Sequence, residues 1–247
     1  MGLVQLDLAP GVHRVEDAFV NWYLIEDNGG ITAVDAGLPS SWGSLKFALR
    51  RLGRGLDDLR AIVLTHAHFD HVGFAEKARR QLGIPVWVHR DEAELAGHPH
   101  SYEVERLPVY YLWRPKAVRI LGRMGAAGAL WAPAISEVHV FDHGDTLDVP
   151  GHPRVIPSAG HTFGHVALHL PDRDVLIAGD AIVTLDPYTG RRGPRLVARA
   201  ATADLDRAMH ALDALEATRA RLLLTGHGEP YVDVATAVAM ARRAGSA

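Results

Sequence analysis

Short apolar runs separated by turn residues fill the first third of the chain, and their periodicity predicts strands followed by strand–helix alternation. The turn Asn28-Gly29-Gly30 between two β-rich runs is typical of a hairpin. Leu59–Thr65 is a continuous aliphatic and β-branched run, the pattern of a strand buried on both faces. The expected strands here are Val12–Glu16, Val20–Glu26, Ile31–Asp35, Leu59–Thr65 and Pro85–His89, and the expected helices are Leu45–Leu52 and Val72–Leu82.

Residues 92–135 interrupt this rhythm, because tyrosine, tryptophan and arginine are interleaved there without a strand period. We expect this segment to be a helical insertion in a single α/β domain that spans residues 1–247. The regular pattern then returns. The later expected strands are Val138–Phe141, Thr146–Val149, Arg154–Pro157, Val166–Leu170, Val175–Ala178 and Leu222–Leu224, and the later helices are Ala203–Thr218 and Val232–Arg243.

The amino-acid composition excludes several kinds of binding partner and catalytic site. The 26 basic and 29 acidic residues give a net charge of −3, which argues against a general binder of nucleic acid or of anionic membranes. The absence of cysteine excludes disulfides, thiolate metal sites, iron–sulfur clusters and a cysteine nucleophile, whereas 15 histidines are many for 247 residues. No signal peptide and no apolar stretch of membrane-spanning length is visible, so we expect a cytoplasmic protein.

The strongest motif is Thr65-His66-Ala67-His68-Phe69-Asp70-His71, which directly follows the buried strand. Histidine and aspartate are metal ligands, and on a loop His66 and His68 can face one ion while Asp70 and His71 turn toward a second. A solvated polar turn is the alternative. The density of metal-type side chains favours the metal site.

Three other strand ends carry further candidates. His161 lies in Gly160-His161-Thr162, Asp180 follows Ala178-Gly179, and His227 lies in Gly226-His227-Gly228. Each one alone is typical of a surface turn. Together they complete the six or seven protein ligands that two ions need.

The ordered set HAHFDH, GHT, GD and GH resembles that of the metallo-β-lactamase superfamily. The resemblance extends from about residue 11 to residue 232, apart from the insertion. It implies a four-layer αββα sandwich, in which two mixed β-sheets pack face to face between helices.

The resemblance also implies a role for each motif residue. His66, His68 and His161 would hold one metal, Asp70, His71 and His227 the second, and Asp180 would bridge both. Asp35, in Val34-Asp35-Ala36-Gly37, matches an early motif of the family and would support the ligands from behind. His165 lies outside the motifs, and its place at the start of the expected strand Val166–Leu170 predicts a supporting or backbone-bonding role.

The implied cofactor is a pair of divalent ions. Zinc is expected, with iron or manganese as alternatives, because imidazole and carboxylate suit all three. A water shared between two such ions becomes a nucleophile near neutral pH, so the implied activity is hydrolysis of a carboxylic ester, thioester or lactone. Asp70 and Asp180 would be the catalytic carboxylates.

Differences from known branches of the superfamily narrow the choice of branch that this chain resembles. The missing thiolate argues against the cysteine-containing lactamases, and the intact Asp180 fits glyoxalase II-like and lactonase-like branches. Only 20 residues follow His227, so we do not expect the glutathione-binding domain of glyoxalase II here. Quorum-quenching lactonases place a tyrosine three residues after the bridging aspartate, where this chain has Val183, with Tyr188 nearby.

Three other functions use the same fold. A persulfide dioxygenase would bind one iron through His66, His161 and Asp180, and a phosphodiesterase would use the same two metals on another substrate. A non-catalytic binding module would have lost ligands, yet every expected ligand is present.

The insertion is the expected specificity element. Between Pro99 and Pro133 it could form a helical lid that binds a small-molecule substrate, or it could pack onto the sandwich or form a homodimer interface. No basic stripe for nucleic acid is visible. The candidate substrate-binding residues are Arg106, Tyr110, Tyr111, Trp113 and Arg114.

Overall fold

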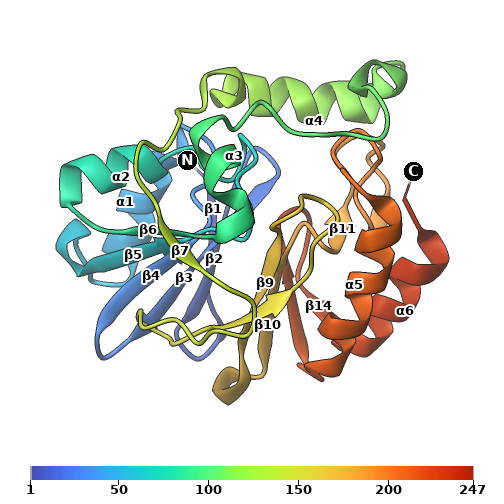
Figure 1. Ribbon diagram of the computed structural model, residues 1–247. Coiled ribbons are helices and arrows are strands. Elements are labelled where there is room, and N and C mark those ends of the chain that lie inside the picture. Colours follow the sequence, from blue (N-terminus) through green and yellow to red (C-terminus); the bar gives the residue numbers. More distant parts are fainter. Residues whose placement is uncertain (1, 247) are drawn as a thin grey trace.

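The computed structural model describes residues 2–246 and contains two facing β-sheets (Figure 1). The first sheet has seven strands in sequence order, of which the first four form an antiparallel meander and the last four pair in parallel. Its strands are β1 (Leu3–Ala9), β2 (Val12–Asp17), β3 (Val20–Asp27), β4 (Gly30–Val34), β5 (Leu59–Val63), β6 (Val86–His89) and β7 (His139–Phe141).

The second sheet has five strands in the order β14-β13-β10-β9-β8, with β10 and β13 parallel and the other pairs antiparallel. A separate hairpin of β11 (Val183–Leu185) and β12 (Arg192–Arg195) lies beside it. The strands of the second sheet are β8 (Arg154–Pro157), β9 (Val166–Leu170), β10 (Val175–Gly179), β13 (Leu222–Thr225) and β14 (Tyr231–Val232).

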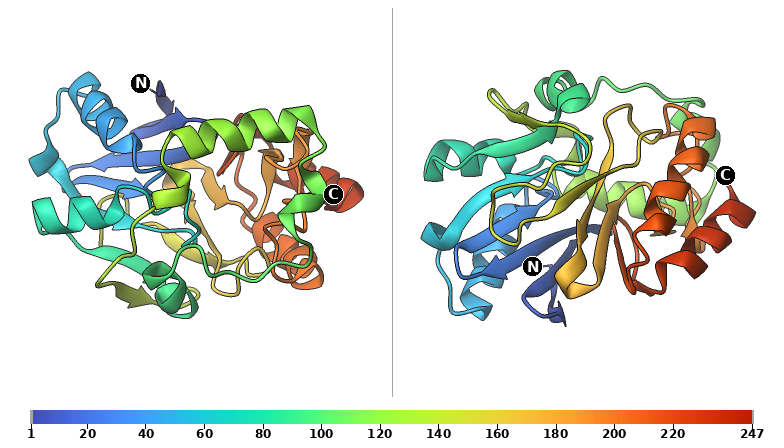
Figure 2. Two further views of the ribbon diagram at one scale, coloured as in Figure 1. Left: turned by 90° about the horizontal axis from the view of Figure 1, so that it is seen from above. Right: turned by 60° about the horizontal axis from the view of Figure 1, so that its bottom comes forward.

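Helices cover the outer face of each sheet (Figures 1 and 2). α1 (Ser41–Arg51), α2 (Ala75–Leu82) and α3 (Ala93–Gly97) lie on the side of the first sheet, and α5 (Leu205–Ala217) and α6 (Val234–Ala244) on the side of the second. Short 3₁₀ turns occupy Leu56–Asp58, Arg90–Glu92, Pro108–Tyr111, Ala129–Trp131 and Pro171–Arg173.

Alternation along the strands explains the layers, because successive side chains of a strand point to opposite faces. In β3, Trp22 and Leu24 pack with the core under α1 and α2, while Tyr23 packs with the core between the sheets. In β10, Ile177 joins that same inter-sheet core and Leu176 packs against α5 and α6. The αββα sandwich that the resemblance implies is confirmed.

One expected strand is absent. The segment Thr146–Val149 forms only an isolated bridge between Thr146 and Arg154. Leu147 and Val149 are nevertheless buried in the core between the sheets, so their apolar alternation reflects burial without a hydrogen-bonded ladder. Periodicity also missed β1, β11, β12 and β14, which are short or partly exposed.

The insertion crosses one end of the sandwich. Its main helix, α4 (Pro115–Ala126), lies across the top of the molecule in Figure 1. Ile120 and Met124 pack against Val20 of the first sheet and Leu185 of the β11–β12 hairpin, so α4 contacts both halves. Among residues 2–246, no helix combines the length and the apolar character that a bilayer span requires.

Candidate metal centre

Four loops at one end of the sandwich bring the predicted ligands together. Each loop follows a strand, and the parallel strands β5, β10 and β13 place their carboxyl ends at this end of the molecule. Ligand sites of α/β folds lie at such strand ends. All seven side chains are buried: His66, His68, Asp70, His71, His161, Asp180 and His227.

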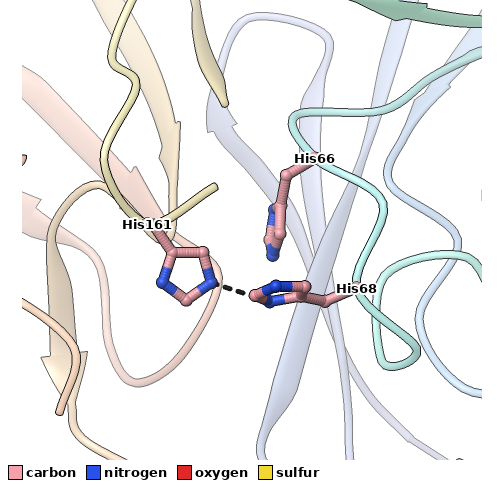
Figure 3. A group of neighbouring side chains, drawn as sticks. All are labelled: His66, His68 and His161. Atoms are coloured by element: carbon pink, nitrogen blue, oxygen red, sulfur yellow. Dashed lines mark hydrogen bonds between the residues drawn. The ribbon is translucent and has the colours of Figure 1, made fainter. Parts of the chain in front are cut away.

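His66, His68 and His161 form the first group. Their rings point toward one another from two different loops (Figure 3), and one nitrogen from each ring lies within 4.8 Å of the others. Nε2 of His161 is 2.9 Å from Nδ1 of His68. Three neutral imidazoles at this spacing match a tetrahedral site with one open position.

A second group contains Asp70, His71 and His227, whose ligand atoms also lie within 4.8 Å of one another. Asp180 lies between the two groups. Its Oδ2 is 3.6 Å from Nε2 of His161 and 3.3 Å from Nε2 of His227. The structure therefore places one carboxylate within reach of both groups.

Gly226 allows this close approach. A Cβ atom at this position would collide with the carboxylate of Asp180. Since only glycine has no Cβ, the loop that carries His227 can pack directly against the bridging residue.

Hydrogen bonds behind the rings fix their orientation. Nδ1 of His227 is 2.8 Å from the carbonyl of Phe19, which can only accept, so Nδ1 carries the proton. Nδ1 of His71 lies 3.0 Å from a carboxylate oxygen of Asp35 in the same arrangement. Both rings thus direct Nε2 toward the centre, as histidines supported by a carbonyl or carboxylate do in metal sites.

Asp35 organises the main motif from behind. Its carboxylate accepts hydrogen bonds from the backbone N–H and the hydroxyl of Thr65, at 2.7 Å and 2.9 Å. Because that hydroxyl donates to Asp35, Nδ1 of His66, 3.0 Å from it, is the donor of the next bond in the chain. Asp35 adopts a left-handed backbone with φ of 62°, a conformation that aspartate tolerates better than most residues.

Several ligand atoms of the two groups have no hydrogen-bond partner within residues 2–246, whereas Nε2 of His227 contacts the carboxylates of Asp70 and Asp180. Nε2 of His66, His68 and His71 and Oδ1 of Asp180 are buried and unpaired among the described residues. Buried polar atoms without a partner cost free energy, so this set fits bound cations. Burial lowers the pKa of His68 to about 4 and that of His66 well below its ordinary value, which keeps both rings neutral.

In the second group the histidine pKa values are raised, whereas in the first group they are lowered. Burial opposes the charge of His71, but the carboxylates of Asp70 and Asp35 outweigh it and raise its pKa to about 9. Asp180 and Asp70 likewise raise the pKa of His227 against the effect of burial. In the metal-free chain these rings are protonated, and metal binding must displace the protons.

His165 is a supporting residue, in the role expected from the sequence. Its Nε2 accepts the backbone N–H of Asp180 at 3.0 Å, and its Nδ1 lies 2.8 Å from the Ser158 hydroxyl. Burial lowers the pKa of His165 to about 3, which is consistent with a neutral ring that accepts at Nε2. The bond fixes the backbone that carries the bridging carboxylate.

Glu92 joins two ligand loops and was not predicted. Its side chain accepts hydrogen bonds from Ala67 N at 2.8 Å, Gly164 N at 2.9 Å and Thr162 Oγ1 at 2.5 Å. Burial raises its pKa to about 7. No sequence signal marks Glu92, because its partners come from distant segments.

Arg14 and Asn21 hold the loop of His227 in a similar way. Arg14 is buried and donates to the Gly228 carbonyl at 2.9 Å, and Asn21 donates to the same carbonyl at 2.7 Å. Asn21 also donates to the Thr225 carbonyl. The meander of the first sheet thereby positions a ligand loop of the second.

A small pocket of about 10 Å³ lies over the ligands and is lined by residues of the insertion and of the β11–β12 region. The Tyr102 ring lies 4.1 Å from that of His68. A hydrogen bond joins Tyr102 to Tyr188, and burial raises the pKa of Tyr102 to about 12. The other lining residues outside the ligand set are Phe69, Leu121, Met124, Pro187, Val197 and Ala201.

The structure places the expected substrate-binding residues elsewhere. Tyr110 and Trp113 are 63% and 72% exposed and do not line this pocket, and Arg106 is also exposed. Arg114 stacks over Trp113, and Tyr111 packs against Tyr188. Within the 3₁₀ turn Pro108–Tyr111, Tyr110 is exposed and Tyr111 is buried, so the aromatic residues of the insertion are divided between packing and the surface.

Comparison with known proteins agrees with this geometry. The family model of the metallo-beta-lactamase superfamily matches residues 15–227. The chain belongs to this superfamily. The chain is therefore a member of a family of metallo-hydrolases, and it carries the histidine and aspartate groups that could bind metal.

Individual relatives support the assignment. The chain is 28% identical to the probable metallo-hydrolase YflN of Bacillus subtilis over 91% of its own length and 86% of that protein. It superposes on the metallo-beta-lactamase family protein TTHA1429 of Thermus thermophilus with a TM-score of 0.69 at 25% identity, covering 95% and 79% of the two chains. The protein TTHA1623, solved in a di-iron-bound form, gives a TM-score of 0.57 at 24% identity over 86% and 89%.

Proposed function

We propose that this superfamily member is a dinuclear, zinc-dependent hydrolase of carboxylic esters, thioesters or lactones. The observation that carries the proposal is the position of Asp180 between two complete ligand groups. One group is His66, His68 and His161, and the other is Asp70, His71 and His227. Iron or manganese would fit the same donors, and the di-iron form of TTHA1623 keeps iron as the main alternative metal.

Bound divalent cations would supply Lewis acidity and a water-derived nucleophile at neutral pH. The chain's own groups would handle the protons. Asp70 lies 3.4 Å from Nε2 of His227 at the mouth of the second group, where its carboxylate can accept a proton during attack. The burial of the whole cluster excludes bulk water and strengthens every charge interaction within it.

The Tyr102–Tyr188 pair provides a neutral hydrogen-bond donor. One hydrogen bond between two hydroxyls leaves one phenolic proton available for another acceptor. Both tyrosines line the pocket, so that proton can reach the oxygen of a bound acyl group. Stabilisation of a developing oxyanion by such a fixed donor is a large term in acyl transfer.

The lining of the pocket favours a neutral acyl substrate over a phosphodiester. None of its described residues is lysine or arginine, the side chains that usually neutralise a phosphate. Leu121, Met124 and Val197 supply apolar surface instead. A small ester, thioester or lactone matches both the apolar walls and the phenolic donor.

A substrate panel with metal quantification tests the proposal. The purified chain is loaded with zinc and assayed on p-nitrophenyl esters, lactones, acyl thioesters, phosphodiesters and β-lactams. Turnover of an acyl substrate with two metals per chain is expected. Exclusive turnover of phosphodiesters or β-lactams would overturn the substrate class, and a single iron with thiol-dependent oxygen uptake would replace hydrolysis with a persulfide dioxygenase activity.

A further inference from the structure

The outer surface of the insertion is unusually apolar. Of the 13 large hydrophobic side chains that are exposed among the described residues, eight lie between residues 107 and 131. Trp113 and Trp131 are 72% and 74% exposed. The eight residues are Leu107, Val109, Tyr110, Leu112, Trp113, Val118, Leu130 and Trp131. We call the surface formed by the exposed side chains of residues 106–131 the insertion face.

The same segment is strongly basic. Residues 106–133 contain five basic residues and no acidic residue, although the whole chain has a net charge of −3. Among the ion pairs of residues 2–246, none includes any of these five side chains, which are Arg106, Arg114, Lys116, Arg119 and Arg123. The overall charge conceals this local concentration, which lies on one side of the molecule.

α4 has two distinct faces. Ile120 and Met124 are buried, and Met124 and Leu121 line the pocket over the candidate metal centre. Lys116, Arg119 and Arg123 repeat at helical spacing on the exposed side. Viewed from above, α4 extends across the top of the molecule (Figure 2). Arg123 lies over the ring of Phe19, and Lys116 and Arg119 line a groove beside the helix.

A basic groove adjoins this helix. It measures about 220 Å³ and is lined by Lys116 and Arg119 of α4 and by Arg192 of β12, with Phe19, Ile120, Leu185 and Gly190 completing its walls. Three cationic side chains around one hollow suit an anionic phosphate head group.

We propose that the insertion face docks on the surface of an anionic phospholipid bilayer. Exposed tryptophan, tyrosine and leucine beside arginine and lysine are the composition of interfacial membrane-binding segments, whose apolar side chains enter the head-group region while the cations attract anionic lipid. A second copy of the chain fits less well. A two-fold dimer through this face would oppose one set of unpaired cations with an identical set.

Vesicle flotation tests the proposal on the metal-loaded chain, and its readout is binding, so it is independent of the substrate assay. The probes are vesicles of phosphatidylcholine alone and of an equal mixture with phosphatidylglycerol. We expect binding only to the anionic vesicles, weakening as salt is raised. We also expect a blue shift of tryptophan emission, because Trp113 and Trp131 are the most exposed tryptophans.

Matched triple variants locate the surface. Lys116→Gln, Arg119→Gln and Arg123→Gln together should lower vesicle partitioning by about 10-fold or more, since each basic residue near the surface contributes roughly a factor of five. Lys46→Gln, Arg50→Gln and Arg51→Gln on α1 remove three positive charges outside the insertion and should leave binding unchanged. None of these residues is in a ligand group, so metal content should stay constant in both variants.

Several outcomes would overturn the proposal. They are no binding to anionic vesicles, equal binding to both vesicle types, or equal loss in the two triple variants. A concentration-dependent dimer that does not bind vesicles would assign the face to a second copy. Binding of a short-chain anionic amphiphile below its micelle concentration, with no binding to vesicles, would assign it to a soluble ligand.

Discussion

The buried carboxylate of Glu92 accepts a hydrogen bond from the backbone N–H of Ala67 at 2.8 Å. Ala67 lies between the ligands His66 and His68, and the other oxygen of Glu92 binds the loop that follows His161. One side chain thus fixes the relative position of two loops that contribute to the same ligand group. A positioning role for Glu92 follows, because it contacts the ligand loops and no ligand atom.

Glu92→Gln should weaken metal binding by about 10- to 100-fold, the usual effect of removing a support behind metal ligands. The amide nitrogen of glutamine would face one of three donors that now share the two carboxylate oxygens. Metal titration would measure the loss, and excess zinc should restore part of the activity. Glu94→Gln, at an exposed position of α3, is the control. Unchanged affinity in Glu92→Gln would remove the positioning role.

Asp35→Asn tests the support behind His71. Asparagine keeps the shape and tolerates the left-handed backbone, but it cannot accept from both His71 and Thr65 with two oxygens. We expect the affinity for the second metal to fall by about 10- to 100-fold and that for the first metal to fall less, because Asp35 contacts His71 directly but reaches His66 only through Thr65. Isothermal titration with zinc would resolve the two sites. Equal weakening of both sites would contradict the assignment of Asp35 to His71.

Tyr102→Phe and Tyr188→Phe should each lower kcat by about 10- to 100-fold at unchanged metal content, because each removes a hydroxyl from the pair that can donate to substrate. Steady-state kinetics on the acyl substrate identified by the panel would measure the effect. Tyr110→Phe, 63% exposed and outside the pocket, should behave like the unmodified chain. An unchanged kcat in both pocket variants would show that the hydroxyls only pack.

The metal-free chain should lose stability between about pH 6.5 and pH 9. The pKa of His71 rises from 6.5 to about 9 on folding, so the protonated ring stabilises the fold fully below pH 6.5, and this contribution disappears as pH rises through about 9. At 1.36 kcal/mol per pKa unit the loss is about 3 kcal/mol. Urea denaturation in chelator would measure it. Stability that is flat or rises over this window would contradict the pairing of His71 with Asp70 and Asp35.

The sequence could identify the ligand set because its signals are local. His66, His68, Asp70 and His71 lie within six positions after an evident strand, and each remaining ligand sits beside glycine at a strand end. Hydrophobic runs located those strands, and the resemblance supplied their arrangement into layers, which periodicity could not.

The supporting residues could not be predicted, because their partners are distant along the chain. Glu92 binds Gly164, 72 positions away, and Arg14 binds Gly228, 214 positions away. The residues that line the pocket likewise come from segments that are distant along the chain. Tyr102 meets Tyr188 only because the segment that follows α3 and the loop between β11 and β12 both lie over the ligands, whereas composition alone drew attention to the exposed Trp113.

The two-metal centre is tested most directly by measuring metal content and hydrolysis together. Both are measured for the unmodified chain and for Asp180→Ala. We expect two divalent ions per unmodified chain, since two ligand groups share Asp180. Asp180→Ala should bind less metal and lose hydrolysis, and His66→Ala should do the same through the first group. Full metal content and full activity in Asp180→Ala would contradict the two-metal centre.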